Sequence, residues 1–210
     1  LQTRLRQGGL FERMLGERFF ETVQADDVGF IRDLIAHLSD QLCIDGARIY
    51  VNGMSNGGGM TNRLACEAAD VFAAAGMVAG AYTDFGGCQP SRPIPVIAFH
   101  GVEDPIVPYE GVSEVYFPAI ESWVADWAAR DQCGATPAAI PNTVGDVTGT
   151  RYTGCAGDAE VDFYTITDGG HTWPGGAMGS QPLMGLLLGK TSTDINASET
   201  MWAFYSAHPM

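Results

Sequence analysis

The pentapeptide Gly53-Met54-Ser55-Asn56-Gly57 decides the fold of this chain. A short β-branched and aromatic run at residues 47–52 precedes it, and a helical pattern at residues 58–69 follows it. A strand, a sharp turn and a helix are what a nucleophile elbow requires, because the turn exposes the serine above the carboxyl end of the strand. We therefore predict that Ser55 is a nucleophile and that the glycines on either side of it permit the tight turn.

The residue after the serine opens the predicted helix. The first N–H groups of a helix have no partner within it, and they lie at the positive end of the helix dipole. We therefore expect the backbone N–H of Asn56 to stabilise an oxyanion. Because a serine hydroxyl is a poor nucleophile at neutral pH, Ser55 also needs a general base.

One of the four histidines has the position expected of that base. His171 lies on a glycine-rich loop at residues 168–175, just after a strand pattern at residues 161–166. His100 also ends a strand pattern and is the main competitor, with a structural role under the site as its alternative. We therefore predict that His171 is the base. The other two histidines are expected to be surface or capping residues: His37 and His208.

Asp104 is the expected acid. It follows the apolar strand pattern at residues 95–99 and precedes Pro105, which restricts the direction of the chain. There it would accept the Nδ1–H of His171 and hold the useful tautomer. The alternative is an aspartate that only initiates an Asp-Pro turn. The other carboxylates that compete for this role are Asp84, Glu103, Asp158, Asp162 and Asp168.

The three segments together resemble a known family. They are G-M-S-N-G-G from residue 53, H-G-x-x-D-x-x-V-P-Y from residue 100 and G-G-H-T-W-P-G from residue 169. Their order of serine, acid and base is that of an α/β-hydrolase triad. From about Asp26 to Gly176 the chain resembles the secreted polyhydroxybutyrate depolymerase and feruloyl esterase-like group of α/β-hydrolases.

This resemblance implies a secreted serine carboxylic-ester hydrolase that works through Ser55, His171 and Asp104 and an acyl-enzyme. The implied substrates are polyesters of the poly-3-hydroxybutyrate type, feruloyl esters or short-chain esters, and no cofactor or metal is implied. Trp173 and Tyr109 are candidates for lining the substrate cleft, with simple packing as the alternative for both.

Residues 1–24 depart from the resemblance. They are rich in arginine and have no secretion-signal pattern. The early strands of the group, and the His-Gly-rich loop that donates its second oxyanion N–H, have no counterpart before Ser55. We expect residues 1–24 to be an atypical N-terminal segment of an incomplete piece, and residues 25–210 to be the catalytic domain. The alternative is a hydrolase-fold binding or structural module, since losing one oxyanion donor costs about 10²–10³ in rate.

Strand and helix patterns alternate from Asp26 onward. This alternation predicts an α/β fold with a mostly parallel sheet flanked by helices. The resemblance implies that the fold is of the α/β-hydrolase type, here without the N-terminal strands. Residues 134–150 are expected to form a loop or hairpin, and residues 175–193 a loop. The expected helices span residues 26–42, 58–69, 115–130 and 196–206. The expected strands span residues 47–52, 72–81, 95–99 and 161–166.

Composition limits the partners. The chain has 210 residues, enough for one domain with a sizeable core. Its formal net charge of −14 would repel a phosphate backbone, so we expect no nucleic-acid partner. No apolar run is long enough to span a bilayer, so we expect no membrane partner. The sequence is compatible with a homo-oligomer. In a prokaryotic protein the acceptor pattern Asn196-Ala197-Ser198 would carry no glycan.

The five cysteines show no C-x-x-C spacing, which argues against a zinc site. Cys133 and Cys155 are placed to close one loop, and Cys66 and Cys88 to form a second pair. Such pairing predicts an oxidising compartment. The alternative is a set of reduced thiols in a cytosolic protein, and Cys43 has no expected partner.

Overall fold

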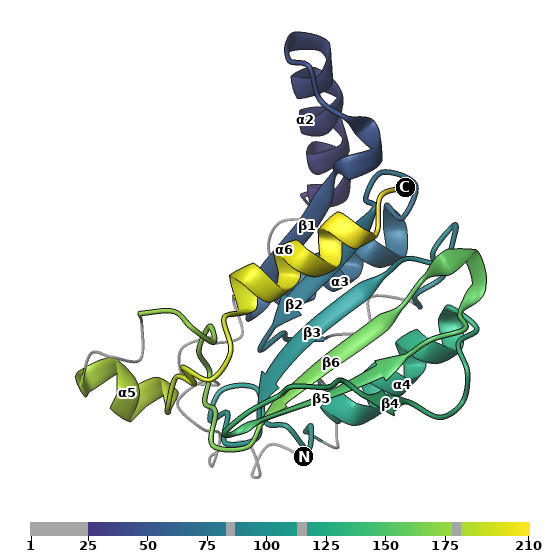
Figure 1. Cartoon of the computed structure of the whole chain (residues 1–210). Helices are drawn as coiled ribbons and strands as arrows, with labels where there is room; N and C mark the ends of the chain where they lie inside the picture. The colour runs from purple at the N-terminus through teal and green to yellow at the C-terminus, as the bar shows by residue number, and fades with distance from the viewer. Residues whose placement is uncertain (1–24, 83–86, 113–116, 178–181) are drawn as a thin grey trace, which may run out of the picture.

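The computed structural model describes residues 25–82, 87–112, 117–177 and 182–210. In these ranges six strands form one sheet in the order β1-β2-β3-β6-β5-β4 (Figure 1). The first four strands in this order run parallel, and β5 and β4 join them antiparallel, which confirms the predicted mostly parallel α/β fold. The strand bounds are Tyr50–Met54 (β1), Ala74–Val78 (β2), Val96–Gly101 (β3), Ala138–Ala139 (β4), Val147–Tyr152 (β5) and Val161–Ile166 (β6). The expected segment 1–24 lies outside the described residues.

Helices cover both faces of the sheet (Figure 1). The α-helices are α2 (Asp27–Gln41), α3 (Asn56–Glu67), α4 (Ile120–Arg130), α5 (Pro182–Leu188) and α6 (Ala197–Ala207), and two 3-10 turns are η2 (Gly46–Arg48) and η3 (Ala156–Asp158). α3 and α4 pack on one face and α6 on the other. Among the described residues, no helix is long and apolar enough to cross a membrane.

Successive side chains of the central strands point to opposite faces of the sheet and so contribute to the hydrophobic core on each face. In β3, Val96 and Ala98 point to the α3 and α4 side, whereas Ile97 and Phe99 point to the α6 side. All residues of β2 and β3 are buried, as expected for parallel strands covered on both faces. The carboxyl ends of these strands therefore extend from a fully packed centre of the sheet.

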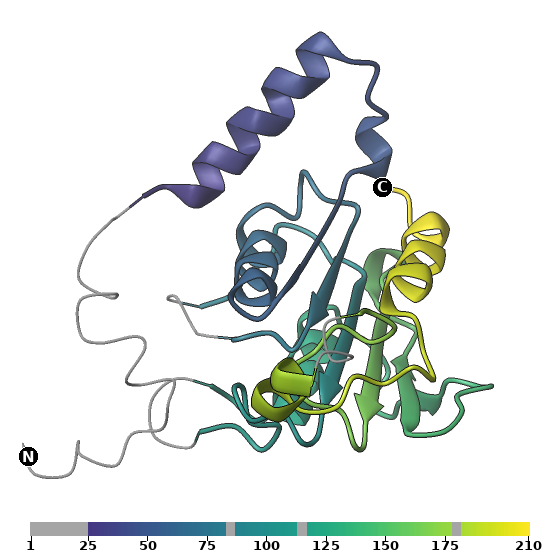
Figure 2. The same cartoon turned by 90° about the vertical axis from the view of Figure 1, so that its left-hand side faces the viewer.

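α2 forms where the sequence predicts it, but its apolar residues are only partly covered: Ile31 and Ile35 pack against the core, whereas Phe30 and Leu34 are exposed. Asp26 caps the helix by accepting the Gly29 N–H at 2.8 Å. Val28 is its only buried residue, and Phe30 is 63% exposed. Figure 2 shows the reason: α2 approaches the rest of the fold at its first turn and then extends away from the sheet.

Three elements show notable differences from expectation. The helix expected from residue 115 begins at Ile120, because Val112 and Phe117 form an antiparallel bridge before it. The first strand begins at Tyr50, since the preceding residues turn in η2. Residues 182–188, expected as loop, form α5, where leucine and methionine are strong helix formers.

Both predicted disulfides are confirmed. Cys66 joins Cys88, and Cys133 joins Cys155, while Cys43 is a free and exposed thiol. The first bridge ties the end of α3 to the loop before β3.

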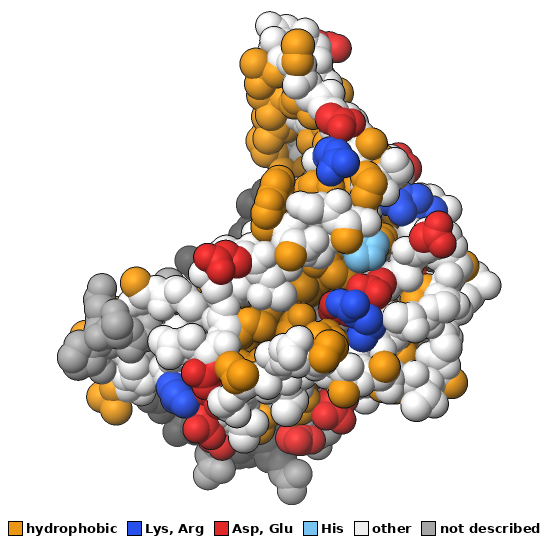
Figure 3. All heavy atoms as spheres, viewed as in Figure 1, with side chains coloured by type: hydrophobic (Ala, Val, Ile, Leu, Met, Phe, Trp, Pro, Cys, Tyr) orange, Lys and Arg blue, Asp and Glu red, His pale blue; other side chains and the backbone are white. Residues whose placement is uncertain are grey.

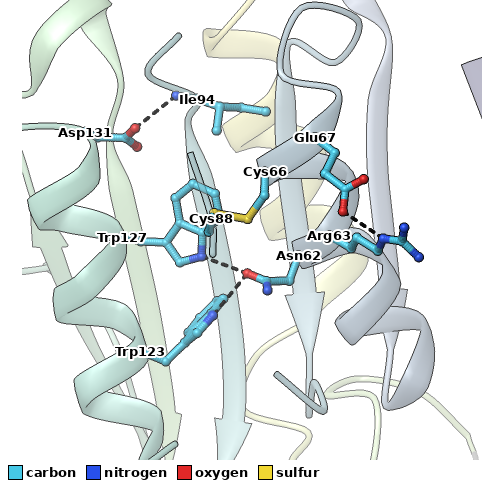
Figure 4. The surroundings of a disulfide bond; sticks show 9 residues. All are labelled: Asn62, Arg63, Cys66, Glu67, Cys88, Ile94, Trp123, Trp127 and Asp131. Atoms are coloured by element: carbon cyan, nitrogen blue, oxygen red, sulfur yellow. Dashed lines mark hydrogen bonds and ion pairs between the residues drawn. A yellow bond between two sulfur atoms is a disulfide. The ribbon is translucent and has the colours of Figure 1, made fainter. Parts of the chain in front are cut away.

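A pair of side-chain hydrogen bonds lies beside the Cys66–Cys88 disulfide (Figure 4). The Asn62 side-chain oxygen of α3 accepts the indole N–H groups of Trp123 and Trp127 at 3.1 and 3.0 Å. These bonds join α3 to α4 without burying an unpaired indole donor.

Asn196 of the glycosylation-like pattern caps a helix. Its side-chain oxygen accepts the N–H groups of Ser198 and Glu199 at 3.1 and 3.2 Å, which fixes the start of α6. The asparagine therefore has a structural function at this position.

Candidate active site

Ser55 occupies a strained turn between β1 and α3. Its φ of 57° and ψ of −123° lie outside the regions that residues with a side chain normally adopt. Its N–H donates to the Val78 carbonyl at 3.0 Å, and its carbonyl accepts from the N–H groups of Gly59 and Ala81 at 3.0 and 3.1 Å. The Ser55 side chain makes no capping bond, so its hydroxyl is not used to hold the helix.

The glycines around Ser55 differ in how much room the structure leaves for a side chain at each position. A Cβ atom on Gly53 would clash with the backbone of Gly57, and one on Gly58 would lie 2.7 Å from the Gly80 Cα. A Cβ atom on Gly59 would clash with the Ala81 carbonyl. At Gly57, by contrast, no atom lies within 4 Å of the added Cβ in the part of the chain that the structure describes. Close approach therefore requires Gly53, Gly58 and Gly59, whereas Gly57 is not needed for it.

Asn56 is the first residue of α3. Its backbone N–H is one of the helix's initial donors, which have no partner within the helix. It lies directly after the serine, where an oxyanion donor of a nucleophile elbow is expected.

Asp104 and His171 are joined by a buried hydrogen bond. His171 Nδ1 lies 2.8 Å from Asp104 Oδ2, and both residues are 5% exposed. The other carboxylate oxygen, Oδ1, accepts the N–H groups of Ile106 and Val107 at 2.8 Å each. The turn after β3 therefore fixes the carboxylate by one oxygen and leaves the other to the histidine.

His100 lies beside this pair without replacing it. Its Nε2 donates to the Val107 carbonyl at 2.9 Å and lies 3.5 Å from Asp104 Oδ2. Burial lowers the pKa of His100, which favours the neutral ring. Its Nδ1 is buried and has no hydrogen-bond partner among the described residues.

Residues 188–190 hold the His171 loop in place through hydrogen bonds. The His171 N–H donates to the Leu188 carbonyl at 2.6 Å. The Lys190 carbonyl accepts the Gly170 N–H at 2.9 Å and the Thr172 hydroxyl at 3.1 Å. The loop is therefore tied on both sides of the histidine.

The Lys190 side chain anchors this segment to the sheet. Its Nζ lies 2.9 Å from Asp146 Oδ2, just before β5, and 3.4 Å from Asp168 Oδ2. The hydroxyl of Ser192 donates to the other oxygen of Asp146. The sequence analysis missed these residues, because no local pattern links residue 146 to residue 190.

Two of the competing carboxylates form ion pairs elsewhere. Asp162 forms a bidentate ion pair with Arg151, at 2.7 and 2.5 Å. Asp168 faces Lys190, and Asp84 lies outside the described residues. Asp104 is therefore the carboxylate that the fold brings to His171.

The two candidate lining residues are engaged in packing contacts. Trp173 is partly buried against the α6 core, and its indole N–H donates to the Ser198 hydroxyl at 3.1 Å. Tyr109 is 8% exposed, and its hydroxyl bonds to Glu121 and Thr165 at 3.1 Å each. The buried position of Tyr109 favours a packing function over contact with a substrate.

The three predicted triad residues follow parallel strands at one edge of the sheet. Ser55 follows β1, Asp104 follows β3 and His171 follows β6, so all three lie at the carboxyl ends. In the described part of the chain, the Ser55 hydroxyl makes no hydrogen bond to His171. Nucleophile and base are often further apart without a substrate than in the reacting complex. Over the same ranges, no group of three His, Cys, Asp or Glu side chains is arranged to hold a metal ion.

Comparison with known proteins finds esterases similar to this chain. A family model described as Esterase PHB depolymerase matches residues 21–154. Feruloyl esterase B of Piromyces equi is 37% identical over 166 residues, covering 74% of this chain and 30% of that protein. Feruloyl esterase C of Emericella nidulans is 30% identical over 148 residues, covering 70% of this chain and 50% of that protein. The chain thus spans half or less of the length of these two relatives.

A solved structure shows the same fold. The acetyl xylan esterase from Aspergillus awamori superposes with a TM-score of 0.53 at 17% identity, covering 85% of this chain and 66% of that one. The likeness at this level concerns the architecture of sheet and helices.

Proposed function

Since this chain belongs to the esterase PHB depolymerase family, we propose that it is a serine carboxylic-ester hydrolase with Ser55, His171 and Asp104 as its triad. The buried hydrogen bond from His171 Nδ1 to Asp104 Oδ2 carries the proposal. This bond leaves His171 Nε2 as the free ring nitrogen, which is the atom a general base uses.

The proposed reaction has two halves. Ser55 Oγ attacks the carbonyl carbon of the ester while His171 Nε2 takes the hydroxyl proton, and Asp104 stabilises the resulting imidazolium. The Asn56 N–H stabilises the negative charge on the carbonyl oxygen. His171 then gives its proton to the leaving alcohol, and an acyl-enzyme forms on Ser55. Water attacks this intermediate by the same route and releases the acid.

The family and the relatives support the proposed substrate class. Polyesters of the poly-3-hydroxybutyrate type, feruloyl esters and short-chain esters are the proposed substrates. Two disulfides support secretion into an oxidising environment. The proposed ester hydrolysis uses no cofactor and no nucleic-acid or membrane partner.

Labelling with a fluorophosphonate tests the proposal directly. One equivalent should react at Ser55, and hydrolysis of nitrophenyl butyrate should stop. Ser55→Ala should be neither labelled nor active, while Ser91→Ala, at an exposed serine outside the site, serves as the matched control. A protein that folds but neither reacts with the label nor hydrolyses esters would instead be a binding or structural module. Labelling at another residue would exclude this triad.

A further inference from the structure

His100 is a buried histidine that the proposed reaction scheme does not use. It lies in β3 and is 1% exposed. Its Nε2 lies 2.9 Å from the Val107 carbonyl oxygen, and a carbonyl can only accept a hydrogen bond, so Nε2 carries the ring proton. A second proton, on Nδ1, would be a buried donor without an acceptor among the described residues. The surroundings therefore select a neutral ring whose one N–H is on Nε2.

This N–H also faces the acid of the proposed triad. His100 Nε2 lies 3.5 Å from Asp104 Oδ2, the oxygen that is 2.8 Å from His171 Nδ1. At 3.5 Å the contact adds little as a hydrogen bond, but it places the positive end of an N–H dipole beside a buried carboxylate. Such a dipole attracts the carboxylate oxygen, because the protein interior screens charges less than water does. His100 therefore contributes to holding the oxygen that faces His171.

His100 closes the turn that carries Asp104. The N–H of Val107 donates to Asp104 Oδ1 at 2.8 Å, and the carbonyl of Val107 accepts from His100 at 2.9 Å. Val107 is fully buried, so both bonds are shielded from water. The contacts thus run from the carboxylate through Val107 to a ring on β3, a strand that is buried along its length. They set the direction of the carboxylate together with the Asp104 side chain itself.

Packing holds the His100 ring in this orientation. The rings of His100 and Tyr109 meet edge to face with their centroids 6.1 Å apart. Tyr109 is itself held, because its hydroxyl bonds to Glu121 of α4 and to Thr165 of β6. Burial lowers the pKa of His100, in agreement with the neutral ring. The ring is therefore fixed both in orientation and in protonation.

We propose that His100 is a positioning residue of the triad, an inference that rests on the proposed function: its Nε2–H holds the turn at Val107 and keeps the Asp104 carboxylate directed at His171. In this scheme His100 exchanges no proton with the substrate. A residue that only filled space at this position would need neither the N–H nor this orientation. The proposal therefore depends on one donor atom, and substitutions that move this atom test it.

Two amide substitutions separate the donor from the rest of the side chain. In His100→Gln the amide nitrogen reaches the position of Nε2, whereas the shorter side chain of His100→Asn places it nearer the position of Nδ1. With nitrophenyl butyrate, His100→Gln should retain most of the parent kcat and His100→Asn should lose about tenfold, because only the second variant loses the hydrogen bond. KM should change little in both. Urea denaturation checks that each variant is folded, and His100→Leu, which has no donor, replaces His100→Asn with the same expectations if that variant does not fold.

The loss should disappear when the proposed base is absent. In His171→Ala, adding His100→Asn should leave the residual rate unchanged, because the effects of residues that act through one another are not additive. A further tenfold loss would show that His100 acts on the fold as a whole, and would overturn the proposal.

His208→Phe is the matched control. His208 is the C-cap residue of α6, and its Nδ1 donates to the Phe204 carbonyl at 2.8 Å, so the variant also removes a histidine bond to a main-chain carbonyl. Figure 3 shows histidine colour near this end of α6. The variant should keep the parent kcat, because this bond lies outside the proposed triad.

Proton NMR tests the geometry without turnover. In Ser55→Ala protein, the Nδ1–H of His171 should give a low-field resonance, identified by its loss when His171→Ala is added. His100→Gln should keep this resonance, and His100→Asn should broaden or remove it, because the carboxylate is no longer held. Equal resonances in the two amide variants, or equal kcat values, would overturn the proposal. A chain that hydrolyses no ester but loses the resonance only in His100→Asn would reject the proposed function and leave the positioning of Asp104 intact.

Discussion

Asp104 Oδ2 accepts the Nδ1–H of His171 at 2.8 Å, and the same oxygen lies 3.5 Å from Nε2 of His100. One carboxylate oxygen therefore faces two buried histidines. The shorter contact belongs to His171, whereas His100 already donates to the Val107 carbonyl. This difference predicts distinct consequences for the two histidines.

His171→Ala should reduce the rate of acyl-enzyme formation by on the order of 10⁴ or more, because it removes the proposed general base. His100→Gln should retain most of that rate and lose mainly stability, because it changes a bond to the Val107 carbonyl. Burst kinetics with nitrophenyl butyrate measure the first effect, and urea denaturation measures the second. A folded but inactive His100→Gln, together with an active His171→Ala, would exchange the two roles.

Asp131 should make stability fall as pH rises. Its side chain is fully buried, Oδ1 accepts the Ile94 N–H at 3.2 Å, and Oδ2 has no partner among the described residues (Figure 4). Burial raises the pKa of Asp131 from 3.8 to about 7. Because the folded pKa exceeds the unfolded one, stability is full below about pH 4 and is lost as pH rises through about 7.

Asp131→Asn should therefore be more stable than the parent at pH 8, by about 2–4 kcal/mol, and equal to it near pH 4. Urea denaturation across this range measures the difference. Asp168→Asn, an exposed carboxylate, is the control and should follow the parent curve. Parallel curves for the parent and Asp131→Asn would contradict the assignment.

The bond between Cys133 and Cys155 should stabilise the fold by closing a loop with a sequence separation of 22. Replacing both residues with serine should lower the free energy of unfolding by about 3 kcal/mol in the chain-entropy model. Cys43→Ser should have no effect, because that thiol is free and exposed. Denaturation without reductant gives the energies, and peptide mapping without reduction should recover the bridged peptides. Five free thiols would refute the pairing.

Lys190→Met should lower kcat only a few-fold, since an exposed ion pair holds its segment weakly. The pair with Asp146 anchors the segment that holds His171, so the effect should fall on kcat with little change in KM for a small soluble ester. Arg32→Met, which breaks the exposed pair with Asp70, is the matched control and should not alter kcat. Equal losses in both variants would show that Lys190 has no special link to His171.

Local sequence patterns were sufficient where neighbouring residues determine the structure. The turn at Ser55, the Asp-Pro turn at Asp104 and the glycine-rich loop at His171 each follow from patterns within about ten residues. The mostly parallel sheet follows from alternating strand and helix patterns, and both disulfides were expected from the spacing of the cysteines.

Long-range contacts could not be predicted in this way. The sequence shows neither the bond of His171 to Leu188 nor the approach of Lys190 to Asp146, because these depend on how the chain returns after β6. α5 was also not predicted, because the glycines in residues 175–193 favour a loop although the segment contains a short run of helix-forming residues. The exposure of apolar residues on α2 could not be predicted for another reason: periodicity reveals an apolar face but not what that face contacts.

The contacts of Gly58 and Gly59 with residues 80 and 81 limit how this protein can be made more heat-resistant. Replacing helix glycines with alanine commonly gains up to about 1 kcal/mol each, so the first turn of α3 looks like an obvious engineering target. At both positions the added methyl group would meet backbone atoms that have little room to move. The substitution would push the helix off the end of β2 and displace the turn at Ser55. Gly57, whose surroundings are open in the described structure, is the position where the same exchange can be accommodated.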